Sequence, residues 1–230
     1  MAVRKRASAM TVAERNRFIN VITQLNLSGF YGSFVSHHAD MMHRMHGSMG
    51  PVGRQRFLPW HRLYLLKLEQ AMQGVDPQAF IPYWRWTKDR AVPSWMVNFR
   101  PTVSVPGIGL VTVNRSPEPP SELPTQARIS GILKLTTFTE FTTDLENRPH
   151  NRVHMWCNGT MSSIPTAPAD PLFWMHHAMI DRIWALWQAK PQNAGKNPTL
   201  SGTDRILDPW PETEAQVRSI AGLGYSYGPG

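Results

Sequence analysis

The sequence contains a single cysteine, Cys157, in 230 residues. One cysteine excludes an intrachain disulfide framework and any zinc site built from several thiolates. The chain also lacks a long apolar run, and its basic N-terminus lacks the apolar stretch of a secretory signal. We therefore expect no membrane segment and a soluble protein that is cytoplasmic, or exported only with a partner. Any metal must be held by nitrogen or oxygen ligands.

Acidic residues are scarce, since 16 Asp and Glu against 24 Lys and Arg give a formal net charge of +8. The basic residues are dispersed, apart from a small cluster at residues 3–6, and no recognition helix or aromatic-interleaved basic module is present. A solvated basic surface explains the charge better than a nucleic-acid site does, so no nucleic-acid partner is expected. The length and the 41% hydrophobic content predict one domain over residues 1–230.

Hydrophobic periodicity predicts a mainly α-helical fold. One helix has a capping box of Thr11 and Glu14 and should end at Gly29. The strongest helix follows Asp170, which can cap it, and starts with Pro171, which suits a first helical position. The predicted helices span residues 11–29, 30 to about 45 (ended by Gly47 and Pro51), 61–73, 122–135, 136–146 and 169–188.

Two stretches do not fit a helix. Residues 98–125 read as a long surface excursion that contains a small β-hairpin around Pro106 and Gly107, and residues 191–230 read as an irregular tail. The predicted fold is thus a four-helix bundle with long loops and a small β-hairpin.

All nine histidines lie on a predicted helix or at its end; His150 and His154, which follow the helix of residues 136–146, have the spacing of one helix face. Any one of them alone is better explained as a buried histidine satisfied by a hydrogen bond. Burying so many imidazoles without a shared role is costly, however, and bundle proteins build two-metal sites from inward-facing side chains. The four groups are His37, His38, His43 and His46; His61; His150 and His154; and His176 and His177.

His150 and His154 are four residues apart, which places two imidazoles on one helix face. Imidazole without thiolate suits copper, zinc, iron or nickel. Carboxylate-bridged di-iron bundles need Glu-x-x-His, but Asn147 and Trp174 stand where the glutamates would be. Two all-histidine sites therefore favour copper. A zinc hydrolase with one three-histidine site remains an alternative, although it would leave the other histidines unexplained.

Four motifs together resemble the coupled binuclear, or type 3, copper proteins, most closely the bacterial tyrosinases, over roughly residues 3–210. They are "FLPWHRLYLLKLE" (57–69), "IPYWRW" (81–86), "LENRPHNRVHMW" (145–156) and "DPLFWMHHAMIDRIW" (170–184). The resemblance implies two copper ions, dioxygen as co-substrate, and the oxidation of phenols: ortho-hydroxylation of monophenols and conversion of o-diphenols to o-quinones.

Position by position, the resemblance implies one copper ion on His38, His46 and His61 and a second on His150, His154 and His177. His43 rivals His46, because the stretch before His61 is longer than is usual in the family. His176 is the neighbour of a ligand in this pattern.

The sequence departs from the family at two positions. Arg44 stands where several fungal and plant relatives have a cysteine that forms a thioether with a histidine ligand, so no such crosslink is expected. Arg85 replaces the acid of the family's "PYWDW", so any role of that acid is absent or belongs to another residue.

The resemblance also implies catalytic roles for Glu146 and Asn151, which in the family orient a water that acts as base. A solvated helix acid is the alternative for Glu146. Met155, Ile164 and Phe173 are expected to line the substrate pocket, with Phe173 packed on an imidazole. Only about 20 residues follow position 210, too few for a covering domain, so we expect an open site unless a separate protein covers it.

Expected partners are small phenols, with a copper chaperone or caddie protein as a further possibility. The basic surface suggests acidic or polymeric phenols as substrates. Three alternatives to a full tyrosinase are a catechol oxidase, an o-aminophenol oxidase and, more remotely, a hemocyanin-like oxygen carrier.

Overall fold

A computed structural model of the chain describes residues 2–229, and it is mainly helical, as the sequence predicts. A π-helical turn, Glu146–His150, joins the helix Phe138–Leu145 (α5) to the helix Asn151–Cys157 (α6) in one continuous rod. The helices are α1 (Val12–Leu27), α2 (Phe30–Ala39), α3 (Gly50–Val75), α4 (Gln126–Ile132), α5 (Phe138–Leu145), α6 (Asn151–Cys157) and α7 (Pro171–Gln188). The strands are β1 (Ala2–Arg4), β2 (Thr102–Val105), β3 (Gly109–Thr112) and β4 (Tyr225–Tyr227).

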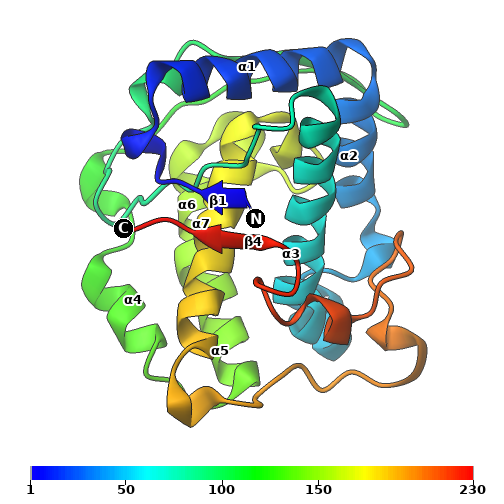
Figure 1. Ribbon diagram of the computed structural model, residues 1–230, viewed down its shortest axis with the longest axis vertical. Coiled ribbons are helices and arrows are strands. Elements are labelled where there is room, and N and C mark those ends of the chain that lie inside the picture. Colours follow the sequence, from blue (N-terminus) through cyan, green and yellow to red (C-terminus); the bar gives the residue numbers. More distant parts are fainter. Residues whose placement is uncertain (1, 230) are drawn as a thin grey trace.

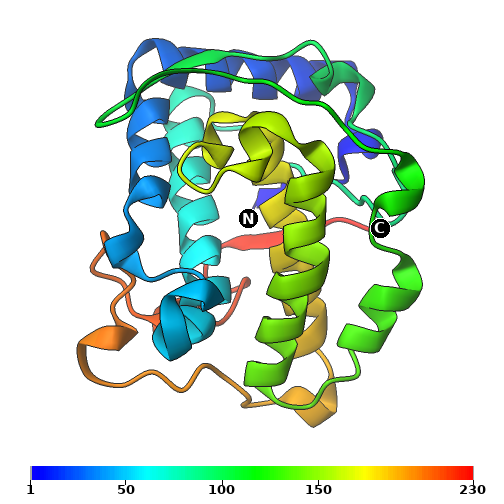
Figure 2. The same ribbon diagram turned by 180° about the vertical axis from the view of Figure 1, so that it is seen from behind.

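Four helical rods form the core: α2, α3, α5 with α6, and α7. Helix α3 packs against α7 and α5, and α1 lies across the ends of α2 and α3 (Figure 1). The view from behind shows the α5–α6 rod running alongside α7, with α2 and α3 on the opposite side (Figure 2). The predicted helical bundle is therefore confirmed. Whether residues 1–230 form a single domain stays a prediction.

Local sequence signals set the ends of two long helices. In α1 the Thr11 hydroxyl accepts from the Glu14 amide at 3.2 Å, and the Glu14 carboxylate accepts from the Thr11 amide at 2.9 Å. In α7 the Asp170 carboxylate accepts from the Leu172 amide at 2.8 Å, while Arg115 holds the same carboxylate through two bonds of 2.6 Å. Both predicted caps are confirmed.

Two predicted helix boundaries are wrong by more than five residues, and the helix expected over residues 122–135 is shorter, Gln126–Ile132. The helix expected to continue to about residue 45 ends at Ala39. The Asp40 side chain accepts from the Met42 amide two residues later, and Arg44 adopts a left-handed backbone, so the helix cannot continue. The next helix starts at Gly50 and not at residue 61. Pro51, which was expected to help end the preceding helix, occupies the first turn of this one, where the missing N–H costs no hydrogen bond.

The predicted hairpin is confirmed, with β2 and β3 pairing antiparallel. It packs closely on α2: a Cβ on Gly32 would lie 1.9 Å from the Ser104 carbonyl oxygen. The tail is irregular as far as β4, which pairs in parallel with β1 and brings the two ends of the chain together (Figure 1). None of the described helices is long and apolar enough to cross a membrane.

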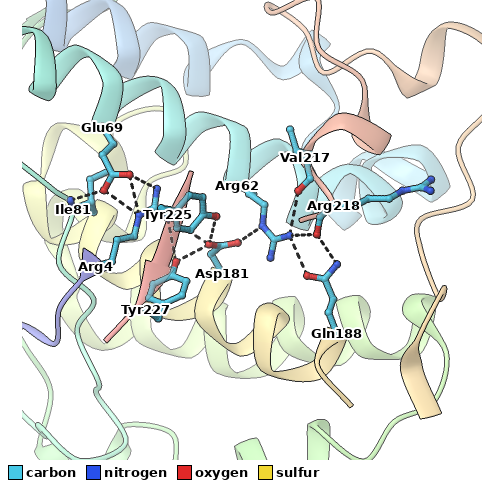
Figure 3. Close-up of polar contacts among 10 residues, drawn as sticks. All are labelled: Arg4, Arg62, Glu69, Ile81, Asp181, Gln188, Val217, Arg218, Tyr225 and Tyr227. Carbon is cyan, nitrogen blue, oxygen red and sulfur yellow. Dashed lines mark hydrogen bonds and ion pairs between the residues drawn. The ribbon is translucent and has the colours of Figure 1, made fainter. Parts of the chain in front are cut away.

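A buried network of hydrogen bonds and ion pairs connects β1 and β4, at the two ends of the chain, to α3 and α7 (Figure 3). Arg62 of α3 donates to Asp181 of α7 at 2.5 Å. The other Asp181 oxygen accepts from the hydroxyls of Tyr225 at 2.7 Å and Tyr227 at 2.6 Å. Arg4 bonds Glu69 at 3.0 Å and reaches Asp181 at 3.4 Å. Arg62 directly follows the candidate ligand His61 in α3, and Asp181 lies one helical turn after the candidate ligand His177 in α7. The ion pair therefore joins the two helices next to two candidate ligands.

We expect Asp181→Asn to lower the free energy of unfolding by about 3–5 kcal/mol at neutral pH, because it leaves the buried Arg62 without its counter-charge. Burial raises the pKa of Asp181, but Arg62, Arg4 and the two tyrosines together hold it below its usual value. A depressed pKa contributes stability above the unfolded value of about 3.9, which is lost as the pH falls through the folded value. Urea unfolding should therefore show the full difference in unfolding free energy between the wild type and Asp181→Asn at pH 7. The difference should become smaller only below about pH 4.

The control is Asp76→Asn. Asp76 is 35% exposed and accepts from Arg17 at 2.8 Å, so its loss should cost far less than the loss of Asp181. Equal losses for the two variants would contradict the stabilising role of the buried network.

Candidate metal centre

The first histidine cluster gathers three side chains from two helices and the loop between them. His38 lies near the end of α2, His61 lies in α3, and His46 comes from the irregular segment that connects them. The His38 Nε2 lies 3.3 Å from His46 Nε2 and 3.4 Å from His61 Nε2. All three imidazoles are buried, so their nitrogens converge in the interior.

The second cluster comes from the other half of the bundle. His150 closes the π-turn, His154 lies one turn later in α6, and His177 lies in α7. The His177 Nε2 lies 3.2 Å from His150 Nε2 and 3.3 Å from His154 Nε2. The clusters adjoin, because the rings of His61 and His177 stack with their centroids 4.4 Å apart.

Acceptors on the far side orient five of the six rings. An oxygen that can only accept requires the hydrogen on Nδ1, which leaves the Nε2 lone pair directed into the cluster. His177 Nδ1 has no hydrogen-bond partner among the described residues, but Phe173 stacks on that ring at 4.1 Å. The acceptors are Ile164 O for His38 (2.9 Å), Glu146 Oε1 for His46 (3.2 Å), Phe57 O for His61 (2.7 Å), Asn151 Oδ1 for His150 (3.0 Å) and Met161 O for His154 (2.8 Å).

The clusters fit metal ions in charge and in size. Burial holds the pKa of His38, His61, His150 and His177 well below the usual value, and it lowers the pKa of His154 to about 4, so these imidazoles are neutral at pH 7. Neutral lone pairs that face one another repel unless a cation lies between them. Bonds of about 2.0 Å at tetrahedral to trigonal angles would separate the nitrogens by about 3.3–3.5 Å, close to the separations found here.

The rival ligand, His43, and the neighbour of a ligand, His176, make none of these Nε2 contacts. His43 packs over Trp60 at 6.2 Å, and its Nε2 faces Asp40 at 3.7 Å. One nitrogen of His176 is within 4.8 Å of the second cluster, but its Nδ1 accepts from Trp86 Nε1 at 3.2 Å. The geometry therefore favours His46 over His43 and His177 over His176.

The two departures from the family pattern point away from the cluster nitrogens. Arg85 reaches Gln126 of α4 at 3.5 Å, and the neighbouring Trp86, not Arg85, contacts His176. Arg44 pairs with the Asp204 carboxylate. Cys157 is buried at the end of α6 as a free thiol.

A cavity of about 370 Å³ opens onto both clusters. Met155 and Ile164 line it as expected, and both are partly exposed. Phe173 does not line it, because its ring is buried beneath His177. Other lining residues were not anticipated, and only their closeness in sequence to the histidine motifs could have indicated them. These are Ser48, Asn147, Met161, Ser162 and Ala167.

Glu146 is a buried wall of this cavity and not a solvated helix acid, since it is 4% exposed. Its two oxygens accept from the Gly47 amide at 2.9 and 3.1 Å, and one lies 3.2 Å from His46 Nδ1. Asn151 lines the same cavity. The turn that carries Glu146 is π-helical and contains Pro149. Glu146 thus links the segment that carries the second cluster to the loop that carries His46.

Comparisons with known proteins agree with this architecture. A family model described as the common central domain of tyrosinase matches residues 28–117 and 110–190. The tyrosinase of Streptomyces galbus is 32% identical over 256 residues, which cover 90% of this chain and 90% of that protein.

Two solved structures share the fold. A functional unit of Octopus hemocyanin superimposes with a TM-score of 0.79 at 23% identity, covering 100% of this chain and 68% of that one. A polyphenol oxidase variant from Thermothelomyces thermophila gives a TM-score of 0.72 at 19% identity, covering 100% and 89%. The family match, the bacterial relatives and the two histidine clusters lead to one conclusion: the chain belongs to the tyrosinase family, and it is a binuclear copper oxidase of phenols that uses dioxygen.

Proposed function

We propose that this protein hydroxylates monophenols as well as oxidising o-diphenols, with one copper ion on His38, His46 and His61 and the other on His150, His154 and His177. The observation that carries the proposal is the carboxylate of Glu146, buried in the cavity wall between the two clusters. Catechol oxidation does not call for a strong base near the substrate, whereas monophenol hydroxylation does.

The two reactions differ in the amount of dioxygen that they consume. A monophenol and one dioxygen give an o-quinone and one water, and a catechol and half a dioxygen give the same products. When bound, the copper pair supplies the reduction of dioxygen and the transfer of one oxygen atom to the ring. The protein must remove the phenolic proton and hold the ring in place.

Glu146 and Asn151 are placed to do this together. Asn151 Oδ1 accepts from His150 Nδ1 at 3.0 Å, so its amide NH₂ is left to donate into the cavity. A carboxylate offers about four lone-pair positions, so the contacts with Gly47 and His46 leave Glu146 able to accept another bond. We propose a water held between these two side chains as the base that takes the phenolic proton.

The cavity itself supports turnover over oxygen carriage. Met155 is 52% exposed and Ile164 is 39% exposed, so both present apolar surface at the mouth for an aromatic ring. A catechol oxidase or an o-aminophenol oxidase would use the same copper ions without the proposed base. A copper chaperone or caddie protein and the cellular location stay predictions.

Oxygen uptake and o-quinone formation by the copper-loaded protein test the proposal directly. Catalytic oxygen uptake with p-ethylphenol and with ethylcatechol is the expected result. Turnover of ethylcatechol alone would show that the protein is a catechol oxidase. Oxygen bound only in proportion to protein, without quinone, would indicate a carrier.

We expect Glu146→Gln to lower monophenol turnover by about 10²–10⁴-fold, the usual contribution of a general base, and to change catechol turnover far less. The amide keeps an oxygen acceptor for the Gly47 amide, so the loop should remain in place. Copper content near two ions per chain is the necessary control. Equal losses toward the two substrates would mean that Glu146 only positions His46.

A second prediction tests His46 as a ligand. A Cβ on Gly53 of α3 would lie 2.0 Å from the His46 carbonyl oxygen, so Gly53→Ala must displace the loop. Metal analysis after dialysis should find about one copper per chain in place of two. Gly74→Ala in the same helix is the matched control, because nothing lies within 4 Å of its Cβ position. Two firmly held ions in Gly53→Ala would overturn the assignment of His46.

A further inference from the structure

We propose that a groove beside the copper cavity binds an anionic group of the substrate, so that the enzyme prefers phenols and catechols that carry a side-chain carboxylate. The inference rests on the proposed function and extends it to the class of substrate. The residue that we assign to this role is Arg148, which lies outside the two histidine clusters.

The groove and the cavity are continuous. The groove has a volume of about 520 Å³ and shares Asn147, Asn151 and Met155 with the copper cavity. A phenol whose hydroxyl is directed at the histidine clusters has its para substituent directed toward the mouth. A short chain at that position passes over Met155 and enters the groove.

Arg148 and Arg128 line this groove, and no acidic residue does among the described residues. The Arg148 side chain is 69% exposed, and its guanidinium has one ionic contact among the described residues, Nε to Asp144 at 3.3 Å. Arg128 pairs with the same carboxylate at 2.5 Å, and its buried Nε has no partner within the described chain. Two cations thus share one carboxylate, which leaves an uncompensated positive charge beside the groove.

Arg152 also lines the groove, but its charge is already compensated. Its guanidinium pairs with Glu118 and lies 3.1 Å from Glu122, and neither acid lines the groove. Arg148 therefore has the more available guanidinium, with two terminal nitrogens free for a planar, bidentate bond to a carboxylate.

The experiment compares kcat/KM for p-hydroxyphenylpropionate, neutral p-ethylphenol and cationic tyramine in the copper-loaded protein. We expect the carboxylate to be preferred over the neutral phenol and tyramine to be disfavoured. The preference should shrink as ionic strength rises, because the arginine is exposed to solvent.

Arg148→Gln should reduce the preference for the carboxylate over the neutral phenol by about two- to fivefold, the range of an exposed ion pair. The change should be in KM, with kcat for p-ethylphenol unchanged, since the contact is equally strong before and during the reaction. Arg148→Lys should keep much of the preference. The matched control is Arg205→Gln, which removes the same charge from an exposed arginine that lines neither the cavity nor the groove.

Two results would overturn the inference: an unchanged preference in Arg148→Gln, or an equal fall in Arg205→Gln, which would trace the effect to net charge alone. The same ratios measured with dihydroxyphenylpropionate and ethylcatechol separate this inference from the proposed function. If only the catechols react, monophenol hydroxylation fails, yet the catechol ratios still decide whether Arg148 selects carboxylates.

Discussion

The fold depends on the convergence of six imidazoles, whose Nε2 atoms lie 3.2–3.4 Å from a neighbour within each cluster. Without a cation these lone pairs would be buried and mutually repulsive, which is costly. The surrounding chain holds five of the six rings in this arrangement through hydrogen bonds to their Nδ1 atoms. Ile164 and Met161, from the loop between α6 and α7, supply carbonyls to His38 and His154, which belong to different clusters. The loop that bounds the cavity therefore also orients one histidine of each cluster.

The spacing between the clusters depends on contacts remote from the cavity. Helices α3 and α7 carry His61 and His177, whose rings stack at 4.4 Å. The Arg62–Asp181 ion pair joins the same two helices, and the Asp181 carboxylate also accepts hydrogen bonds from the two tyrosines of β4. Since β4 also pairs with β1, the two ends of the chain help to fix the register of helices on which a binuclear site depends.

Local chemistry determines the features that could be predicted from the sequence: the caps at Thr11 and Asp170, the hairpin, and the shared face of His150 and His154. The predictions failed where distant segments decide the backbone. Pro51 is compatible with both the end and the start of a helix, and the packing of residues 50–60 against the rest of the bundle selects the start. The pairing of β1 with β4 joins residues more than 220 positions apart, and such three-residue strands have no periodic signal. Phe173 was correctly expected to contact an imidazole, but the sequence could not show that it lies beneath His177 and outside the cavity.

The break after α2 shows why helical periodicity had to fail at the metal site. On a continuous helix His46 would lie about 80° around the axis from His38 and about 12 Å along it, so the two could not share an ion. A helix would also use the Gly47 amide internally, whereas that amide here donates to Glu146. Ending α2 at Ala39 thus brings His46 into the cluster and frees a donor for the carboxylate that we propose as part of the base. The same irregular loop supplies one histidine of the first cluster and holds the carboxylate of Glu146 in the cavity wall.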